Sequence, residues 1–187
     1  MKTPILIAAA LLATSAAVAS HAATAPAASG PGSGSPSDPC PTIGTIAEAK
    51  GPFPLTGERM IRLETACGHR EMTDHIRSYG KDLRYLLVAD DLRASVQPGT
   101  VFHLRLGRTR STETAVIGAI NFFAAKRPGA AGPPHSISFD VTETIRSLVT
   151  SGWPAQGLGV AIAPTGEVAP GADATVGALR LVAQERR

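Results

Sequence analysis

The sequence predicts a mainly β fold: an antiparallel β-sandwich of the jelly-roll or Greek-key type with one short helix. Short apolar segments recur through residues 81–187, and most of them alternate apolar with polar residues, as half-buried strands do. Turn signals built on Pro and Gly separate these segments at the short spacing that is typical of a sandwich. One stretch, 141–149, instead places its apolar residues at helical spacing.

The predicted strands, in chain order, are 61–64, 84–89, 100–106, 114–123, 136–141, 158–163 and 175–183. In most of them apolar and polar residues alternate, which predicts one buried and one exposed face. The segment 114–123 is apolar on both faces, so it is predicted to be a strand buried between layers. The segment from His69 to Arg77 is polar and irregular, and we expect a surface loop there.

The predicted helix has signals at both of its ends. Asp140 is placed to cap it, and Glu143 follows three residues later, as in a capping box. Gly152 is expected to end it, because glycine readily takes the left-handed conformation that terminates helices. The apolar stripe of this helix consists of Val141, Ile145, Leu148 and Val149.

The 187 residues divide into four predicted parts: a signal peptide over 1–22, a flexible linker over 23–39, a Cys-containing N-terminal segment over 40–80 and a β-sandwich domain over 81–187. Lys2 precedes an apolar run that is too short to span a bilayer, and small residues follow the run, as in a secretory signal. The linker has no large apolar residue that would offset the entropy of ordering it. We therefore expect a periplasmic or secreted protein without a membrane span.

The chain has two cysteines, Cys40 and Cys67. An even number of cysteines in an oxidising compartment favours pairing, so a disulfide between them is expected. In the chain-entropy model, closing a loop of this size contributes on the order of 3 kcal/mol to stability. The predicted role of this bridge is to hold the N-terminal segment in place.

Composition and motifs exclude several classes of function. Aromatic residues make up only 4% of the chain and its formal net charge is +3, which is too little for base stacking or for a nucleic-acid surface. The sequence contains no His-Glu-x-x-His motif, no Gly-x-Ser-x-Gly elbow and no phosphate or dinucleotide loop. We therefore expect a protein that is not an enzyme, has no resident cofactor and does not bind nucleic acid.

One cluster of side chains has the chemistry of a copper site. Cys67, His69, Met72 and His75 supply the thiolate, thioether and imidazole ligands that soft copper prefers. Two observations favour an ordinary surface loop instead: Cys67 is expected to pair with Cys40, and methionine usually fills gaps in a core. Copper binding by His69, Met72 and His75 stays open as an alternative.

A succession of short motifs in the second half of the chain gives a family resemblance. The motifs are Tyr85–Val88, Gln97–Leu104, Val116–Phe123, Phe139–Thr142 with Ile145–Arg146, Leu158–Pro164 and Ala174–Leu181. In this order they resemble the C-terminal domain that follows the dicopper core in bacterial tyrosinases and plant polyphenol oxidases. The resemblance covers about residues 83–183 and does not extend over the Cys-containing segment.

The resemblance implies a β-sandwich that packs on a dicopper core, covers the copper site and inserts a bulky side chain as a placeholder for substrate. This chain has neither the core nor its paired histidine motifs. The implied function is a non-catalytic exported accessory domain that docks on a separately encoded dicopper oxidase and shields it or helps it mature. Phe122 and Phe123 are the placeholder candidates, and at least one of them is expected to face the core, because adjacent strand residues face opposite ways.

A shorter resemblance supports a different function. Asp140–Thr142 before a helix, followed by a strand from Gly157, is similar to sandwich domains of secreted surface and carbohydrate-associated proteins. The alternative is therefore a secreted β-sandwich binding module, unrelated to oxidases, for a carbohydrate or a cell-surface ligand. Such a module would need an exposed aromatic or acidic patch.

Overall fold

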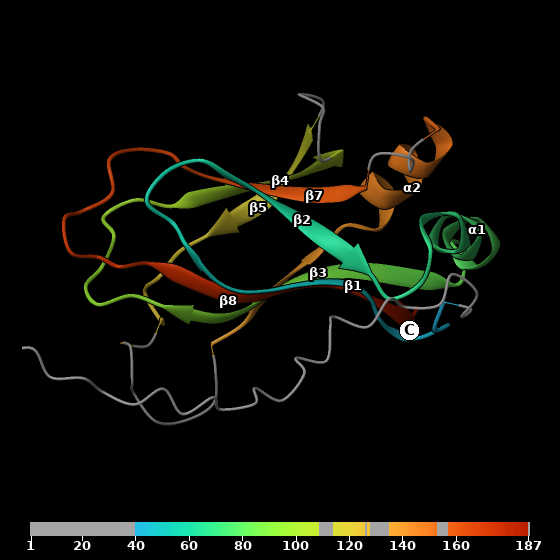
Figure 1. Cartoon of the computed structure of the whole chain (residues 1–187), viewed down its shortest axis with the longest axis horizontal. Coiled ribbons are helices and arrows are strands. Elements are labelled where there is room, and N and C mark those ends of the chain that lie inside the picture. Colours follow the sequence, from blue (N-terminus) through green and yellow to red (C-terminus); the bar gives the residue numbers. More distant parts are fainter. Residues whose placement is uncertain (1–39, 109–113, 126, 128–134, 153–156, 187) are drawn as a thin grey trace, which may run out of the picture. The chain divides into compact units, whose positions relative to one another are not determined.

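The computed structural model describes residues 40–186 except for 109–113, 126, 128–134 and 153–156, and these residues belong to one compact unit. The predicted signal peptide and linker lie outside the described residues. The unit is mainly antiparallel β, which confirms the predicted class at this level (Figure 1). Its elements are β1 (Gly44–Pro54), β2 (Arg59–Thr65), α1 (His69–Tyr79), β3 (Leu83–Arg93), β4 (Phe102–Arg108), β5 (Thr114–Ile120), β6 (Ile137–Asp140), α2 (Thr142–Thr150), β7 (Leu158–Pro164) and β8 (Thr175–Glu185).

The eight described strands form one sheet in the order β5-β4-β7-β2-β1-β8-β3-β6, and all paired neighbours are antiparallel. The sheet curls until its two end strands approach each other, so it is nearly closed and barrel-like. Gly118 of β5 lies against Phe139 of β6, and a Cβ added at Gly118 would overlap the Phe139 ring. Glycine is therefore required where the two ends of the sheet meet.

The sheet has a weak seam between β1 and β2. These strands are joined by only two residue pairs, Ala47 with Thr65 and Glu48 with Glu64. By contrast, β1 pairs with β8 along nearly its whole length, and β2 pairs with β7 along most of its own. The seam thus divides the sheet into two four-stranded halves, one of β1, β8, β3 and β6, the other of β2, β7, β4 and β5.

The N-terminal segment 40–80 is an integral part of the sheet. Its two strands, β1 and β2, occupy the middle of the strand order and connect the two halves. Cys40 and Cys67 form the predicted disulfide, with their Cα atoms 5.1 Å apart. The bridge lies directly beside the seam, where Ala66 also donates its N–H to the Ile46 carbonyl at 2.9 Å. The disulfide therefore fastens the two halves at the point where the strand pairing is weakest.

The part of the chain that the structure describes contains two helices, whereas the sequence predicted one. The segment His69–Arg77, expected to be a surface loop, lies within α1. Met72 and Ile76, four residues apart, are buried, and the buried polar residues Thr73 and His75 complete the same face. The prediction was wrong because two of the four residues on this face are polar, so the apolar stripe is too sparse to show helical periodicity.

Strand β5 is not buried between layers, as its apolar sequence predicted. It lies at one end of the sheet order and most of its residues are partly or fully exposed; Val116, for example, is 62% exposed. Much of its apolar character comes from small residues, which are acceptable at the surface. A strand that is apolar on both faces therefore does not by itself identify an interior strand.

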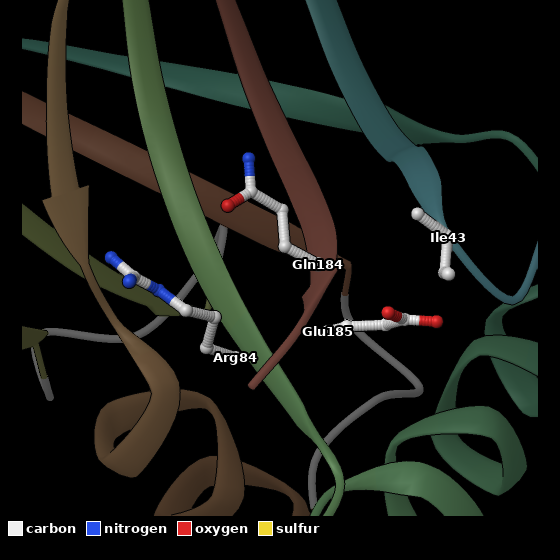
Figure 2. A pocket seen from close by; sticks show the side chains of 4 residues that line it. All are labelled: Ile43, Arg84, Gln184 and Glu185. Carbon is white, nitrogen blue, oxygen red and sulfur yellow. The ribbon is translucent and has the colours of Figure 1, made fainter. Parts of the chain in front are cut away.

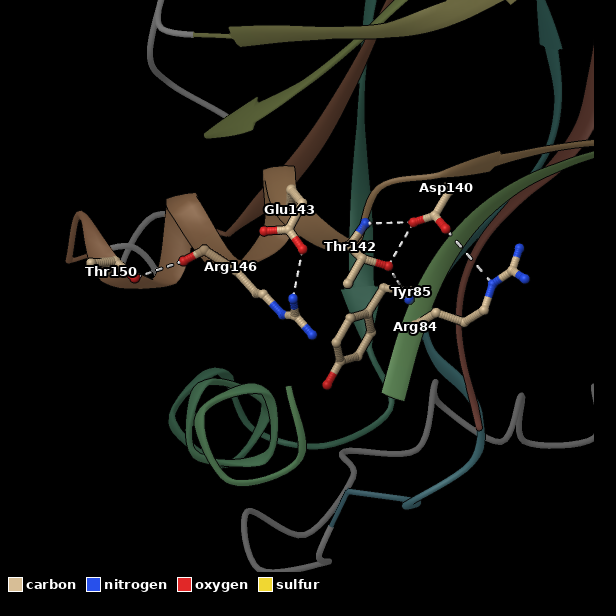
Figure 3. Close-up of polar contacts among 7 residues, drawn as sticks. All are labelled: Arg84, Tyr85, Asp140, Thr142, Glu143, Arg146 and Thr150. Atoms are coloured by element: carbon tan, nitrogen blue, oxygen red, sulfur yellow. Dashed lines mark hydrogen bonds and ion pairs between the residues drawn. The ribbon is translucent and has the colours of Figure 1, made fainter. Parts of the chain in front are cut away.

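Helix α2 begins at Thr142, and its N-cap residue is Val141 instead of the predicted Asp140. Asp140 Oδ1 accepts hydrogen bonds from the backbone N–H of Thr142 (3.0 Å) and from its hydroxyl (2.6 Å), and the Thr142 hydroxyl oxygen accepts the Tyr85 N–H at 2.9 Å (Figure 3). The hydrogen bond from Thr142 lowers the pKa of Asp140. Glu143 pairs with Arg146 at 2.6 Å instead of closing a capping box. This network joins the start of α2 to β3.

The core lies between the two halves of the sheet and is mainly aliphatic. Phe102 and Phe122 add an edge-to-face aromatic pair whose ring centroids are 5.5 Å apart. In Figure 1 the two helices lie at one end of the sheet, and the loops β1–β2, β3–β4 and β7–β8 lie at the other end. The fully buried strand residues Ile46, Leu63, Leu87, Leu104, Leu106, Val160, Ile162, Leu179 and Leu181 form the centre of the core.

Candidate binding surface at the loop end

Three loops meet at the end of the sheet away from the helices: 94–101, 121–125 and 165–174. Backbone hydrogen bonds hold the first and the third together: Thr165 donates its N–H to Val101 (2.9 Å), and Ala169 donates to Pro98 (2.8 Å). The second loop is attached by a side chain, because Gln97 Nε2 donates to the Phe122 carbonyl at 2.9 Å. The loop end is therefore a fixed surface rather than three independent turns.

The structure separates the two placeholder candidates. Strand β5 ends at Ile120, so Phe122 and Phe123 lie in the turn that follows it. Phe122 is 1% exposed and packs on Phe102 in the core, whereas Phe123 is 82% exposed. The turn is held by Ala125, which donates its N–H to the Phe122 carbonyl at 3.0 Å. One phenylalanine therefore anchors the turn, and the other is presented to solvent.

Beside Phe123 lies a hollow of about 480 Å³, within the range of small-molecule sites. Its lining side chains include Gln97, Thr100, Asn121, Phe123, Thr165 and Glu167. Within the described residues, no lysine or arginine lines this hollow, and Glu167 is its one charged group. The hollow therefore carries one negative charge and several hydrogen-bonding side chains, with one aromatic ring at its rim.

The disulfide removes Cys67 from the residues considered for copper. Cys67 is bonded to Cys40, so its thiolate is not available to a metal. Met72 is fully buried in the core and His75 is 6% exposed. His69 begins α1, and its side chain lies outside what the structure describes. In the part of the chain that is described, no group of three His, Cys, Asp or Glu side chains is placed to hold a metal ion.

His75 belongs to an aromatic cluster between α1 and β3, in which His75 and Tyr85 are buried and Tyr79 is 43% exposed. The His75 ring lies 5.2 Å from the Tyr79 ring and 6.3 Å from the Tyr85 ring. Neither His75 Nε2 nor the Tyr85 hydroxyl has a hydrogen-bond partner among the described residues. Burial lowers the pKa of His75; burial also raises the pKa of Tyr85 to about 12, against an opposing effect of the positive charge on Arg146. Figure 3 shows the Tyr85 hydroxyl pointing toward α1.

His75 makes stability sensitive to pH. Because its pKa is lower in the folded protein than in the unfolded chain, the unfolded chain binds more protons as the pH falls through about 6.5, and stability declines. We expect urea midpoints to fall between about pH 7.5 and pH 5, and His75→Phe to remove most of that dependence while keeping ring packing. A Val116→Ala control, which removes no titratable group, should keep the dependence of the urea midpoint on pH. An unchanged dependence in His75→Phe would show that this histidine is not the source.

A second hollow, of about 530 Å³, lies beside the C-terminal end of β8 and is lined by Ile43, Arg84, Gln184 and Glu185. Figure 2 shows that these side chains do not converge: Arg84 and Gln184, which are paired across β3 and β8, extend in a similar direction, whereas Glu185 extends the other way, toward Ile43. Arg84 is also held by Asp140, with Nε 3.7 Å from Oδ2. This hollow therefore lacks a set of groups directed at one ligand.

No known protein family matches the chain, and no curated protein matches it. Neither described helix has the length and apolar character needed to cross a membrane.

Most of the residues that line the hollow were not identified as site residues from the sequence. Gln97 and Asn121 lie inside motifs that carry the family resemblance, and Thr165 lies in a predicted turn, so each had a local signal. Glu167 had none. The loops of these residues are far apart in the chain, and their meeting depends on strand order, which alternation of apolar and polar residues does not specify.

Proposed function

We propose that the chain is a non-catalytic exported accessory domain that docks on a separately encoded dicopper oxidase and shields it or helps it mature. The observation that carries this proposal is the position of Phe123. It lies in the Val116–Phe123 motif, which is part of the resemblance to the C-terminal domains of tyrosinases and polyphenol oxidases, and it is 82% exposed. A placeholder side chain must be large, exposed and held on a fixed turn, and Phe123 meets these requirements.

The arrangement of the resembling motifs supports the same proposal. They lie on or directly beside β3, β4, β5, β6, α2, β7 and β8, so they follow one another through the fold in the order of the resemblance. We infer that the two four-stranded halves correspond to the two layers of a sandwich. The predicted signal peptide and the disulfide are in keeping with an exported domain.

The energetics of Phe123 favour a role in binding. An exposed phenylalanine contributes little to folding, whereas burying it in a partner is worth roughly 1.5–3 kcal/mol. At protein interfaces, a few central aromatic residues carry a large share of the binding energy. Since Gln97 and Asn121 already fix the turn, little conformational entropy remains to be lost on docking.

Phe123→Ala is the variant that tests this function. With a purified tyrosinase-like oxidase core, we expect the wild-type chain to form a complex and to change oxidase activity, because Phe123 covers the copper site. The variant should bind at least about tenfold more weakly, corresponding to the loss of about 1.4 kcal/mol. Binding is measured by calorimetry and activity by turnover of a phenol.

The matched control is Val116→Ala, because Val116 is also exposed and apolar but does not line the hollow beside Phe123. This variant should bind as the wild type does. The absence of any complex at micromolar concentration, or equal weakening by both variants, would contradict the proposal.

A further inference from the structure

The hollow beside Phe123 has hydrogen-bonding groups left over after its own internal bonds are made. Gln97 uses its Nε2 to bind the carbonyls of Phe122 (2.9 Å) and Phe123 (3.5 Å), which leaves its side-chain oxygen as an acceptor. Asn121 Oδ1 accepts the Phe123 N–H at 3.4 Å, which leaves its amide group as a donor. Glu167 makes no hydrogen bond or ion pair within the described residues. The hollow therefore offers both donors and acceptors.

The two threonines of the hollow are mainly structural. Their hydroxyl oxygens lie 3.1 Å apart, and each also lies within reach of the Val101 carbonyl, at 3.3 Å for Thr100 and 3.2 Å for Thr165. They join the loops 94–101 and 165–174, so the hollow is formed before any ligand arrives. A preformed site loses less free energy to ordering when it binds.

The charged groups described around the hollow do not suit two ligand classes. An anion such as phosphate would find no lysine or arginine among the described lining residues, and it would face the carboxylate of Glu167. A hard cation such as Ca²⁺ takes six to eight oxygen ligands, usually including several carboxylates, and the described lining holds one carboxylate. The described lining therefore suits a neutral ligand whose groups both donate and accept hydrogen bonds, as hydroxyls do.

Phe123 adds a requirement for an apolar face. Its ring stands at the rim of the hollow with 82% of its surface exposed, and the face of an aromatic ring carries a negative quadrupole that attracts weakly positive C–H groups. A sugar ring combines an apolar C–H face with hydroxyls around its edge. The volume of about 480 Å³ gives room for one or two such rings.

We propose that this hollow binds a neutral saccharide, with Phe123 against the C–H face of a sugar ring and with Gln97, Asn121 and Glu167 bonded to its hydroxyls. This inference goes beyond docking on an oxidase and does not require an oxidase partner. It is tested on the isolated chain, so a failure here leaves the docking experiment unaffected.

The experiment is an NMR titration of the full oxidised chain with glucose, galactose, N-acetylglucosamine and cellobiose. At least one of them should shift the backbone amides of loops 94–101, 121–125 and 165–174 in a saturable way, with a Kd of roughly 0.1–10 mM. Phe123→Ala and Glu167→Gln should each weaken binding about tenfold. Both side chains are exposed, so the spectra of the two variants should otherwise match that of the wild type.

Two controls give the test its specificity. Val116→Ala should leave the Kd unchanged, and inorganic phosphate should produce no saturable shift at the loop end. The inference is overturned if no saccharide shifts these amides up to about 100 mM, which is well above the expected Kd range. It is also overturned if phosphate binds there, or if both site variants bind saccharide as tightly as the wild type does.

Discussion

Phe122→Ala is expected to destabilise the protein by about 3–5 kcal/mol, whereas Phe123→Ala, one residue later, should change stability by less than about 0.5 kcal/mol. The two residues have the same side chain but opposite surroundings: Phe122 is 1% exposed and packs edge-to-face on Phe102, while Phe123 is 82% exposed. Removing Phe122 leaves a cavity beside a large fully buried ring, and the surrounding core relaxes only in part. Urea unfolding of both variants measures their free energies of unfolding, and equal m-values show that the two can be compared directly.

This pair of variants also tests the position of the turn after β5. If the two phenylalanines lay within a strand in the opposite register, the side chains would exchange places and the large loss of stability would fall on Phe123. Equal losses in the two variants would contradict the described turn. A loss confined to Phe122 would support it and would leave Phe123 available for binding.

Replacing both cysteines, Cys40→Ser with Cys67→Ser, is expected to lower stability by about 2–4 kcal/mol. The bridge lies at the seam where β1 and β2 are joined by only two residue pairs, so few backbone hydrogen bonds remain there to hold the two halves of the sheet. The melting temperature should fall by roughly 5–15 °C in a domain of this size. Reducing the wild-type protein with dithiothreitol should give the same shift.

Hydrogen exchange locates the effect. In the double variant, amides of β1 and β2 near Ala47 and Thr65 should lose protection from exchange first. The amides that pair β3 with β8 should keep most of their protection. An unchanged melting temperature, or uniform loss of protection across the sheet, would show that the bridge does not hold the seam.

The strands of the second half were predictable because their local pattern and their environment agree. Ile137 and Phe139 alternate with serines, and Leu104 and Leu106 alternate with the polar residues His103 and Arg105, as the structure places them. The alternation pattern failed to predict an element where some of the buried residues are polar. In α1, Thr73 and His75 take positions on the buried face, and no scale of hydrophobicity marks a buried histidine that lies against Tyr79 and Tyr85.

Strand β1 was missed for a different reason. Its sequence from Gly44 to Pro54 includes Gly51, Pro52 and small residues such as Ala47 and Ala49, which favour no single local structure. Its conformation is imposed by pairing with β8 at one edge and with β2 at the other. Long-range pairing of this kind cannot be read from a single segment, because it depends on residues more than 100 positions away in the chain.

The candidate surface was predictable in part. The motif Val116–Phe123 directed attention to the two phenylalanines, and alternation required at least one of them to turn inward. Which of the two is exposed depends on where β5 ends. Asn121, a residue type that is common in turns, directly follows that end, but Phe122 and Phe123 after it continue the apolar character of the strand. The surrounding hydrogen-bonding groups come from three loops that only the sheet topology brings together.

The most direct test of the central proposal is hydrogen–deuterium exchange of the full chain, alone and mixed with a tyrosinase-like dicopper oxidase core. If the loop end docks on the oxidase, protection should rise in loops 94–101, 121–125 and 165–174 and stay unchanged in α1 and α2, which lie at the other end of the sheet (Figure 1). Protection that appears on the helices instead, or no change anywhere in the chain while the oxidase is folded and in excess, would contradict docking through Phe123.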